Sequence, residues 1–153
     1  MSSPAGRKPT RGDYVTWRTA TTRWRDDDAY GHLNNATYYE LFDTAVNAHL
    51  YEATGLDVRA LPQIGVVAET SCRYFREIGF PEPIEMGMVV DKVGTSSVIY
   101  RIGLFQGDPE GAGAEAAAEG RFVHVYVDNT DPARPVTPMP DSIRAAVSPL
   151  LRD

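Results

Sequence analysis

The sequence is poor in cysteine and has no long apolar run. Its 153 residues include a single cysteine, Cys72, so no disulfide can form within the chain. No stretch of about 18 apolar residues occurs, and the polar first residues lack the apolar segment of a secretion signal. We therefore expect no membrane insertion and a cytoplasmic location.

Positive charge is also scarce. The chain has 15 Lys and Arg against 21 Asp and Glu, a formal net charge of -6. Proteins that bind nucleic acid usually present a broad basic face, so we expect no nucleic-acid partner. Hydrophobic residues make up 42% of the chain and charged residues 24%, which is typical of one globular domain. We place this domain at residues 14–153, after a flexible tail at residues 1–13.

Several catalytic signatures are missing. The G-x-S-x-G turn of serine hydrolases does not occur. Cys72 and His124 form a weak nucleophile pair, because a lone cysteine in an apolar strand pattern is usually a core residue. Asp26, Asp28 and His32 form a weak metal-site candidate, because the three histidines are scattered along the chain. We predict no metal.

One long segment has apolar residues at helical spacing. In residues 36–54, Tyr38, Phe42 and Ala45 recur at intervals of three to four and predict an amphipathic helix. Candidate helix caps are Asn34, Asn35 and a Thr37–Glu40 capping box, and Gly55 is a stop signal.

The remainder alternates with the period of β-strands. We predict strands at residues 16–25, 66–74, 84–90, 96–105 and 121–127. Residues 107–115 are predicted to form a flexible hairpin loop, and a short helix is predicted from about residue 141. In the second strand one face is predicted to hold Val66, Ala68, Thr70, Cys72 and Tyr74. This order favours an α+β fold, with one antiparallel sheet and the long helix across one face.

The connection before the long helix has an unusual composition. Asp26, Asp27 and Asp28 are adjacent, and His32 and two asparagines follow. A helix start presents unpaired amides that can polarise a carbonyl oxygen, and a carboxylate beside it can attack that carbonyl or activate water. Turn and cap formation also uses Asp, Gly and Asn, so a purely structural role stays open.

This stretch resembles a known family. The run D26-D27-D28-A-Y-G-H32-L-N34-N35-x-x-Y38, followed by a helix and four strands, resembles the hotdog-fold acyl-CoA thioesterases, in particular the 4-hydroxybenzoyl-CoA thioesterase type. The resemblance implies a hotdog fold, in which an antiparallel sheet wraps around a long central helix. It also implies hydrolysis of an acyl-CoA thioester without any cofactor, because coenzyme A is part of the substrate.

Site residues follow from the same resemblance. Asp28 matches the nucleophile or general base, whereas Asp27 stands where a small Thr or Cys is usual. The residues that match the substrate-binding positions are His32, Asn34, Asn35 and Tyr38. For the coenzyme A moiety, the resemblance implies the turn with Lys92, Ser96 and Ser97. The cations that we consider for its phosphates are Lys92, Arg73, Arg76, Arg101, Arg121 and Arg134.

An open sheet leaves an unpaired strand edge, so we expect a homodimer or a dimer of dimers. The resemblance implies the same, with active sites at the interface. Three alternatives remain: a hotdog module that binds an acyl ligand without turnover, a hotdog enoyl-CoA hydratase or dehydratase, and a structural interaction domain.

Overall fold

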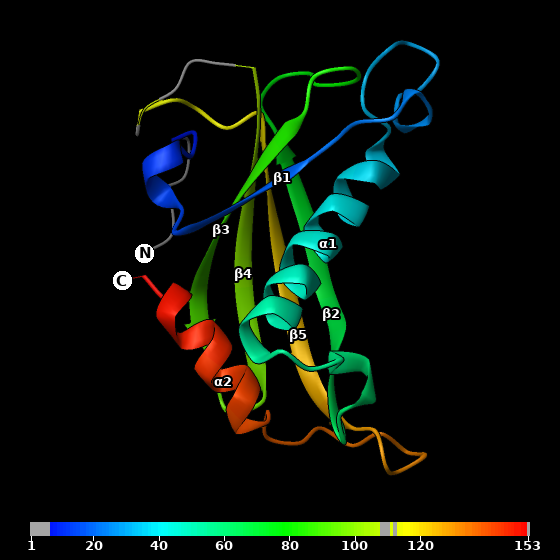
Figure 1. The fold of residues 1–153 in the computed structure, drawn as a ribbon, viewed down its shortest axis with the longest axis vertical. Helices are drawn as coiled ribbons and strands as arrows, with labels where there is room; N and C mark the ends of the chain where they lie inside the picture. Colours follow the sequence, from blue (N-terminus) through cyan, green and yellow to red (C-terminus); the bar gives the residue numbers. More distant parts are fainter. Residues whose placement is uncertain (1–6, 108–110, 112, 153) are drawn as a thin grey trace.

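The computed structural model describes residues 7–107, 111 and 113–152 (Figure 1). Its strands are β1 (Thr16–Ala20), β2 (Gln63–Tyr74), β3 (Ile84–Val93), β4 (Ser97–Gln106) and β5 (Ala118–Asp128). Its α-helices are α1 (Asn35–Thr54) and α2 (Asp141–Val147). Short 3-10 turns form at Arg11–Asp13, Trp24–Asp26, Val58–Ala60 and Ser148–Leu150. The predicted order of elements and the α+β hotdog class are confirmed.

Two predicted flexible segments fall partly outside the described residues. These are residues 1–6 of the predicted tail and residues 108–110 and 112 of the predicted loop. Within the described part, Thr10 bridges to Glu115 in an antiparallel manner. The domain limits stay a prediction. In the described part of the chain, no helix has the length and apolar character needed to cross a membrane.

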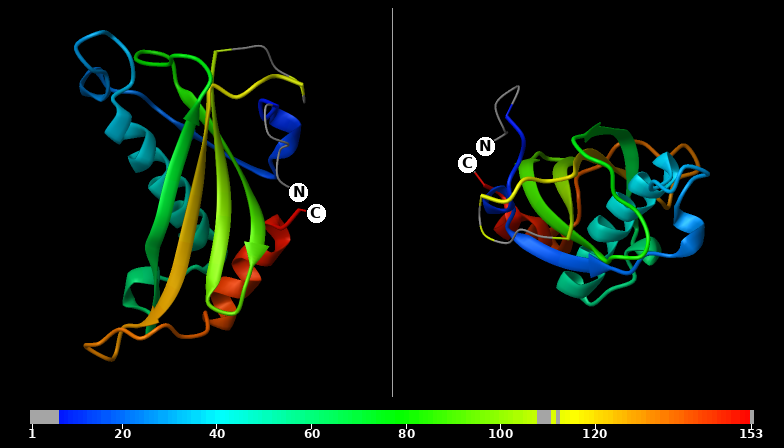
Figure 2. Two further views of the ribbon diagram at one scale, coloured as in Figure 1. Left: turned by 180° about the vertical axis from the view of Figure 1, so that it is seen from behind. Right: turned by 90° about the horizontal axis from the view of Figure 1, so that it is seen from above.

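The sheet is fully antiparallel, with the strand order β1-β3-β4-β5-β2. β2 therefore pairs with β5 and not with its chain neighbour β3, and it forms one edge of the sheet. Figure 2 shows the sheet from behind, with α1 on its far side. The edge strand β2 carries exposed apolar residues, including Val67 (47% exposed) and Tyr74 (49% exposed).

The boundaries of α1 follow from its sequence. The Asn34 side chain accepts a hydrogen bond from the Ala36 amide (3.0 Å) and caps the helix, so it is Asn34 among the candidate caps that is used. At the other end Gly55 adopts φ 69°, a left-handed conformation that glycine reaches without strain. Between these ends, Tyr38, Phe42 and Ala45 are buried, as the spacing predicts.

The main core lies between α1, α2 and one face of the sheet. Its sheet residues include Met86, Met88 and Val90 on β3, Val98, Tyr100, Ile102 and Leu104 on β4, and Phe122 and Tyr126 on β5. The Phe42 ring packs directly on the backbone of Gly120, where any Cβ would collide with it. α1 therefore approaches β5 at the one position where the strand has no side chain.

Two predicted strands differ from the observed ones. The first ends at Ala20, opposite Ile84, because β3 begins there and no partner strand extends further. The predicted face of β2 is wrong for Val66, because a bulge between Val67 and Glu69 shifts the register. Thr70 and Cys72 lie opposite Phe122 and Gly120 on the helix side, whereas Val66 lies opposite Val125 on the other face.

Candidate functional site

The turn before α1 is anchored by Asp26, which is buried (7% exposed). Its carboxylate accepts hydrogen bonds from the Arg23 amide (2.7 Å) and guanidinium (2.8 and 3.1 Å). Burial by itself would raise the pKa of Asp26, but the hydrogen bonds from Arg23 outweigh it and hold this pKa below its usual value. The Asp26 carbonyl also accepts from the Asn34 amide (2.8 Å), so Asp26 fixes the turn to the helix start.

Asp28 lies exposed in the loop of this turn. Its Oδ1 accepts hydrogen bonds from the amides of Tyr30 (2.8 Å) and His32 (3.2 Å). The Asp28 amide in turn donates to the His32 carbonyl (2.7 Å). Oδ2 has no hydrogen-bond partner among the described residues. The backbone therefore orients one oxygen of the carboxylate and leaves the other available.

Asp27 contacts a second loop. Both of its carboxylate oxygens accept from the Phe80 amide (3.1 and 3.3 Å). A Cβ at Gly79 would lie 3.0 Å from Asp27 Oδ1, so the glycine lets the two loops approach closely. The Leu33 amide donates to the Ile78 carbonyl (2.7 Å) and adds a backbone link. The extra carboxylate of this sequence thus holds the loop after β2 against the Asp28 turn.

The four predicted substrate-binding residues have different surroundings. His32 is half-buried, and its Nε2 lies 2.9 Å from Glu77 Oε2. Asn34 caps α1, and Asn35 accepts a hydrogen bond from the Tyr74 hydroxyl. Tyr38 is buried (5% exposed), with its ring 5.0 Å from that of Tyr74. Burial raises the pKa of Tyr38 to about 12, so its hydroxyl is neutral at pH 7.

A pocket of about 500 Å³ opens beside Asp28. Its lining consists of Trp24, Asp27, Asp28, Ala29 and Gly31. Trp24 is 82% exposed and packs edge-on against Phe80, at 5.9 Å between ring centroids. The sequence pattern assigned Trp24 to a strand and did not predict that it lines this pocket. The sequence signal that could have indicated this was its position two residues before the run of three aspartates.

The predicted coenzyme A contacts lie at the opposite end of the sheet. Lys92 lies near the end of β3, Ser96 in the turn between β3 and β4, and Ser97 at the start of β4, and this turn lies beside α2 (Figure 1). β4 separates this turn from the Asp28 end and spans about 30 Å. Lys92 is exposed, whereas the Ser96 carbonyl accepts from the Tyr126 amide (2.7 Å). One chain therefore does not bring these residues to Asp28.

Several of the candidate phosphate-binding arginines are engaged in ion pairs. Arg101 is buried (5% exposed) between Asp91 (2.8 Å) and Glu119 (3.0 Å). Arg73 also pairs with Glu119 (3.0 Å). Arg121 pairs with Glu69, and Arg76 donates to the Gln106 carbonyl (3.0 Å). Arg134 lies in a turn with φ 46°.

The structure does not bring together the residues of the two weaker candidate sites, the Cys72–His124 pair and the metal site. Cys72 lies opposite Gly120, four residues from His124 along β5, or about 13 Å. Burial raises the pKa of the Cys72 thiol to about 11, which disfavours a thiolate. Across residues 7–107, 111 and 113–152, no group of three His, Cys, Asp or Glu side chains is arranged to hold a metal ion.

Comparison with known proteins identifies relatives of this chain. Residues 22–147 match the model of the thioesterase-like superfamily. Comparison with curated proteins gives no match.

Solved structures give closer detail. The PA5185 protein of Pseudomonas aeruginosa is 42% identical, with 96% of this chain and 99% of that chain covered and a TM-score of 0.86. PA2801, a proposed thioesterase of Pseudomonas aeruginosa, is 29% identical over 88% of this chain and 99% of that chain (TM-score 0.75). Slr0204, a 1,4-dihydroxy-2-naphthoyl-CoA thioesterase from Synechocystis, is 12% identical over 86% and 93% (TM-score 0.74) and is similar in fold.

Proposed function

Because the chain belongs to the thioesterase-like superfamily and is a thioester hydrolase, we propose that it cleaves acyl-CoA thioesters to the free acid and CoA, with Asp28 as nucleophile or general base. One observation carries this proposal. Asp28 lies in a pocket at the start of α1, with Oδ1 held by two amides and Oδ2 available to substrate or water.

The start of α1 supplies the positive partial charge that the reaction needs. Of its first amides, that of Ala36 is bonded to Asn34 Oδ1 and that of Thr37 to the Asn34 carbonyl (2.9 Å). The Asn35 amide has no partner in the described part of the chain and is our candidate donor to the thioester oxygen. As the carbonyl becomes tetrahedral, such a donor stabilises the developing negative charge.

Asp28 can act by either of two routes. As a general base, Oδ2 takes a proton from water, the hydroxide adds to the carbonyl carbon, and the C–S bond breaks to release CoA thiolate. As a nucleophile, Oδ2 attacks the carbonyl and forms a mixed anhydride with loss of CoA thiolate, and water then cleaves the anhydride. Both routes give the carboxylic acid and free CoA.

The substrate-binding residues act around this carboxylate. We propose that His32, held by Glu77, and Asn35, held by Tyr74, line the channel to the thioester carbonyl. Asn34 keeps its cap and positions the helix amides. Tyr38, whose hydroxyl is neutral at pH 7, packs edge-on against Tyr74.

A second copy of the chain would complete the site. We propose a homodimer in which the exposed edges of two β2 strands pair antiparallel. Such pairing places the Tyr74 end of one strand beside the Gly65 end of the other. It brings the Lys92–Ser97 end of one protomer toward the Asp28 end of its partner, where it could contact the coenzyme A phosphates. Sedimentation equilibrium tests the dimer, and a monomer at micromolar concentration contradicts it.

Thiol release tests the activity. Purified full-length protein is assayed against acyl-CoA esters with short aliphatic, long aliphatic and aromatic acyl groups. Release above the uncatalysed rate with at least one acyl class supports the proposal. Tight binding of acyl-CoA without thiol release contradicts it and identifies a binding module instead. Hydration of an enoyl-CoA, followed by ultraviolet absorbance, would identify a hydratase.

A further inference from the structure

The loop that joins β2 to β3 lies against the turn that carries Asp28, at the top of the view in Figure 1. We call residues 75–83 the β2–β3 loop and residues 27–33 the Asp28 turn. The residues of the β2–β3 loop are all described by the structure and form neither helix nor strand. Pro81 and Pro83 have no amide hydrogen to donate, so other groups must attach this segment to its surroundings.

The β2–β3 loop bonds to both ends of the Asp28 turn. At one end, the Phe80 amide donates to the two oxygens of the Asp27 carboxylate (3.1 and 3.3 Å). At the other end, the Leu33 amide donates to the Ile78 carbonyl (2.7 Å). Asp27 and Leu33 also form an antiparallel bridge with each other, which closes the turn. The loop therefore fixes the two ends of the segment that carries Asp28.

A third attachment joins the two segments through side chains. His32 Nε2 lies 2.9 Å from Glu77 Oε2. The amide of the same His32 donates to Asp28 Oδ1 (3.2 Å). The loop thus also holds a residue that orients the Asp28 carboxylate.

The Gln106 side chain attaches the β2–β3 loop to the sheet. Gln106 is the last residue of β4 and is half-buried. Its Oε1 accepts a hydrogen bond from the Gly79 amide (3.0 Å), and its Nε2 donates to the carbonyls of Gly79 (2.6 Å) and Glu82 (2.8 Å). A primary amide suits this position, because it accepts on one side and donates twice on the other. One side chain therefore satisfies three backbone groups of the loop.

Gly79 lies between Gln106 and the Asp28 turn. A Cβ at Gly79 would lie 3.0 Å from Asp27 Oδ1 and 3.0 Å from the Gly31 carbonyl oxygen. The backbone that Gln106 holds is thus packed closely on the turn. Because protein interiors are close-packed, a displacement of Gly79 must either displace the turn or open a gap beside it.

We propose that Gln106 is a positioning residue for the Asp28 carboxylate and acts through the β2–β3 loop. Its side chain bonds to Gly79 and Glu82, and the loop in turn fixes both ends of the Asp28 turn. This inference rests on the proposed function. Misplacement of a reacting group by about 1 Å can lower a rate by about 10²-fold, so release of the loop should have a measurable effect on turnover.

Gln106 should matter more than any one of the three attachments between loop and turn. Removal of the Asp27 carboxylate breaks one attachment and leaves the other two, with the loop still bound to β4. Removal of the Gln106 amide frees the loop itself, so that all three attachments lose their fixed base. The effect of a Gln106 variant on turnover should therefore exceed that of Asp27→Thr.

Gln106→Met tests the proposal, because methionine has a similar length and no amide. With the acyl-CoA ester that the wild type hydrolyses fastest, we expect kcat to fall about tenfold and KM to change less than about threefold. In the Asp28→Asn background the same substitution should change kcat by less than about twofold, because no carboxylate is left to position. A merely structural role would give the same loss in both backgrounds, or no loss in either.

Amide hydrogen exchange measures whether the Asp28 turn is loosened. The Leu33 and Phe80 amides bond across the two segments, and they should exchange at least about tenfold faster in Gln106→Met. The Gly55 amide, which donates to the Tyr51 carbonyl (2.9 Å) at the other end of α1, should exchange as in the wild type. NMR of the labelled full-length protein follows all three amides.

Thr54→Val is the matched control. It removes another hydrogen bond from a side chain to a backbone carbonyl, that of Thr54 Oγ1 to Leu50 (2.7 Å), at the end of α1 away from Asp28. It should leave kcat and the exchange of the Leu33 amide unchanged, even where stability falls. Gln106→Glu loses both donors to the loop and should give the same kinetic result as Gln106→Met, so it decides if the methionine variant fails to fold.

Two results would overturn the proposal. One is wild-type kcat in the Gln106 variants, and the other is an equal loss of kcat in the wild-type and Asp28→Asn backgrounds. If the wild-type protein releases no thiol, or Asp28→Asn retains wild-type turnover, it is the proposed function that fails. Exchange at Leu33 and Phe80 then still decides whether Gln106 holds the Asp28 turn, and unchanged exchange would overturn that as well.

Discussion

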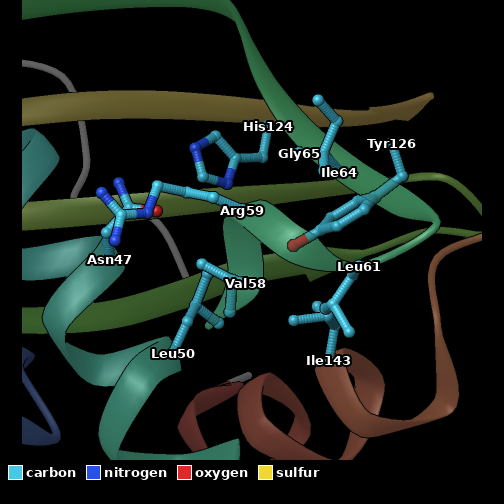
Figure 3. A pocket seen from close by; sticks show the side chains of 10 residues that line it. All are labelled: Asn47, Leu50, Val58, Arg59, Leu61, Ile64, Gly65, His124, Tyr126 and Ile143. Carbon is cyan, nitrogen blue, oxygen red and sulfur yellow. The ribbon is translucent and has the colours of Figure 1, made fainter. Parts of the chain in front are cut away.

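The two ends of α1 hold polar groups in opposite environments. At the N-terminal end, Asp28 is exposed, its carboxylate is oriented by backbone amides, and the residue lines a pocket of about 500 Å³. In the C-terminal half, His124 is buried beside a cavity of about 140 Å³ (Figure 3), with Nδ1 unpaired among the described residues. An exposed carboxylate can contact substrate and water, whereas burial lowers the pKa of the His124 imidazole and leaves it neutral at pH 7. Four predictions test this difference between the two ends of α1.

The largest effect is expected at the exposed end. Asp28→Asn should lower kcat by roughly 10² to 10⁴, because the variant loses an acid–base or nucleophilic group, while the melting temperature stays close to that of the wild type. The matched control is Asp131→Asn, since Asp131 makes a similar turn bond to the Ala133 amide (2.9 Å). A thiol-release assay measures both. Wild-type turnover by Asp28→Asn would remove Asp28 from the mechanism.

The buried end should control stability in acid. The pKa of His124 falls from 6.5 to about 4 in the folded protein, so between these pH values the unfolded chain binds a proton that the folded chain does not. Stability should therefore decrease as the pH is lowered from about 6.5 to about 4, by up to about 3 kcal/mol from this residue. Urea unfolding of the wild type and His124→Phe at several pH values measures the effect. Equal pH slopes in the two proteins would show that His124 is not desolvated.

The close packing of the middle of α1 on β5 depends on the absence of a side chain at Gly120. Gly120→Ala places a methyl group against the Phe42 ring and should destabilise the protein by about 1 to 3 kcal/mol. Thermal unfolding followed by circular dichroism would show a decrease of several degrees. Gly113→Ala, whose methyl group meets no atom within 4 Å, is the control. An unchanged melting temperature for Gly120→Ala would mean that α1 does not approach β5 so closely.

The smallest effect is expected at Asp27, next to Asp28, the carboxylate proposed to react. Asp27→Thr should retain kcat within a few fold but lose about 1 kcal/mol of stability, because the Phe80 amide loses its carboxylate acceptor. Asp27→Asn keeps an acceptor oxygen and serves as the control for stability. Thiol release and thermal unfolding are measured on the same preparations. A loss of kcat as large as that of Asp28→Asn would mean that Asp27 is the reactive carboxylate.

Local sequence signals predicted some features because those features depend on near neighbours. Asn34 and Gly55 bound α1 through bonds and dihedral angles within a few residues. The alternation of Val98, Tyr100 and Ile102 marks the buried face of β4 for the same reason. The Asp28 turn closes on itself through Tyr30 and His32, so its motif can be recognised in the sequence.

Other features depend on partners far away in the chain. The bulge at β2 moved Val66 to the opposite face, and it exists only in the pairing with β5. Trp24 joins the site wall through Phe80, a residue 56 positions later. The sequence did not show what the Asp27 carboxylate binds, because its hydrogen-bond donor, the Phe80 amide, lies in the loop after β2.

The sequence alone determined the order of the elements, the limits of α1 and the run of three aspartates before it. Each of these depends on hydrophobic period, capping chemistry or a contiguous motif, and such signals act over a few residues. Tertiary structure alone decided that β2 pairs with β5 at the sheet edge, that Asp27 braces a second loop and that Gly65, His124 and Tyr126 surround one cavity. Gly65 and His124 are separated by about 60 positions, and only the packing of α1 and α2 on the sheet buries the imidazole and removes the water that would stabilise its protonated form.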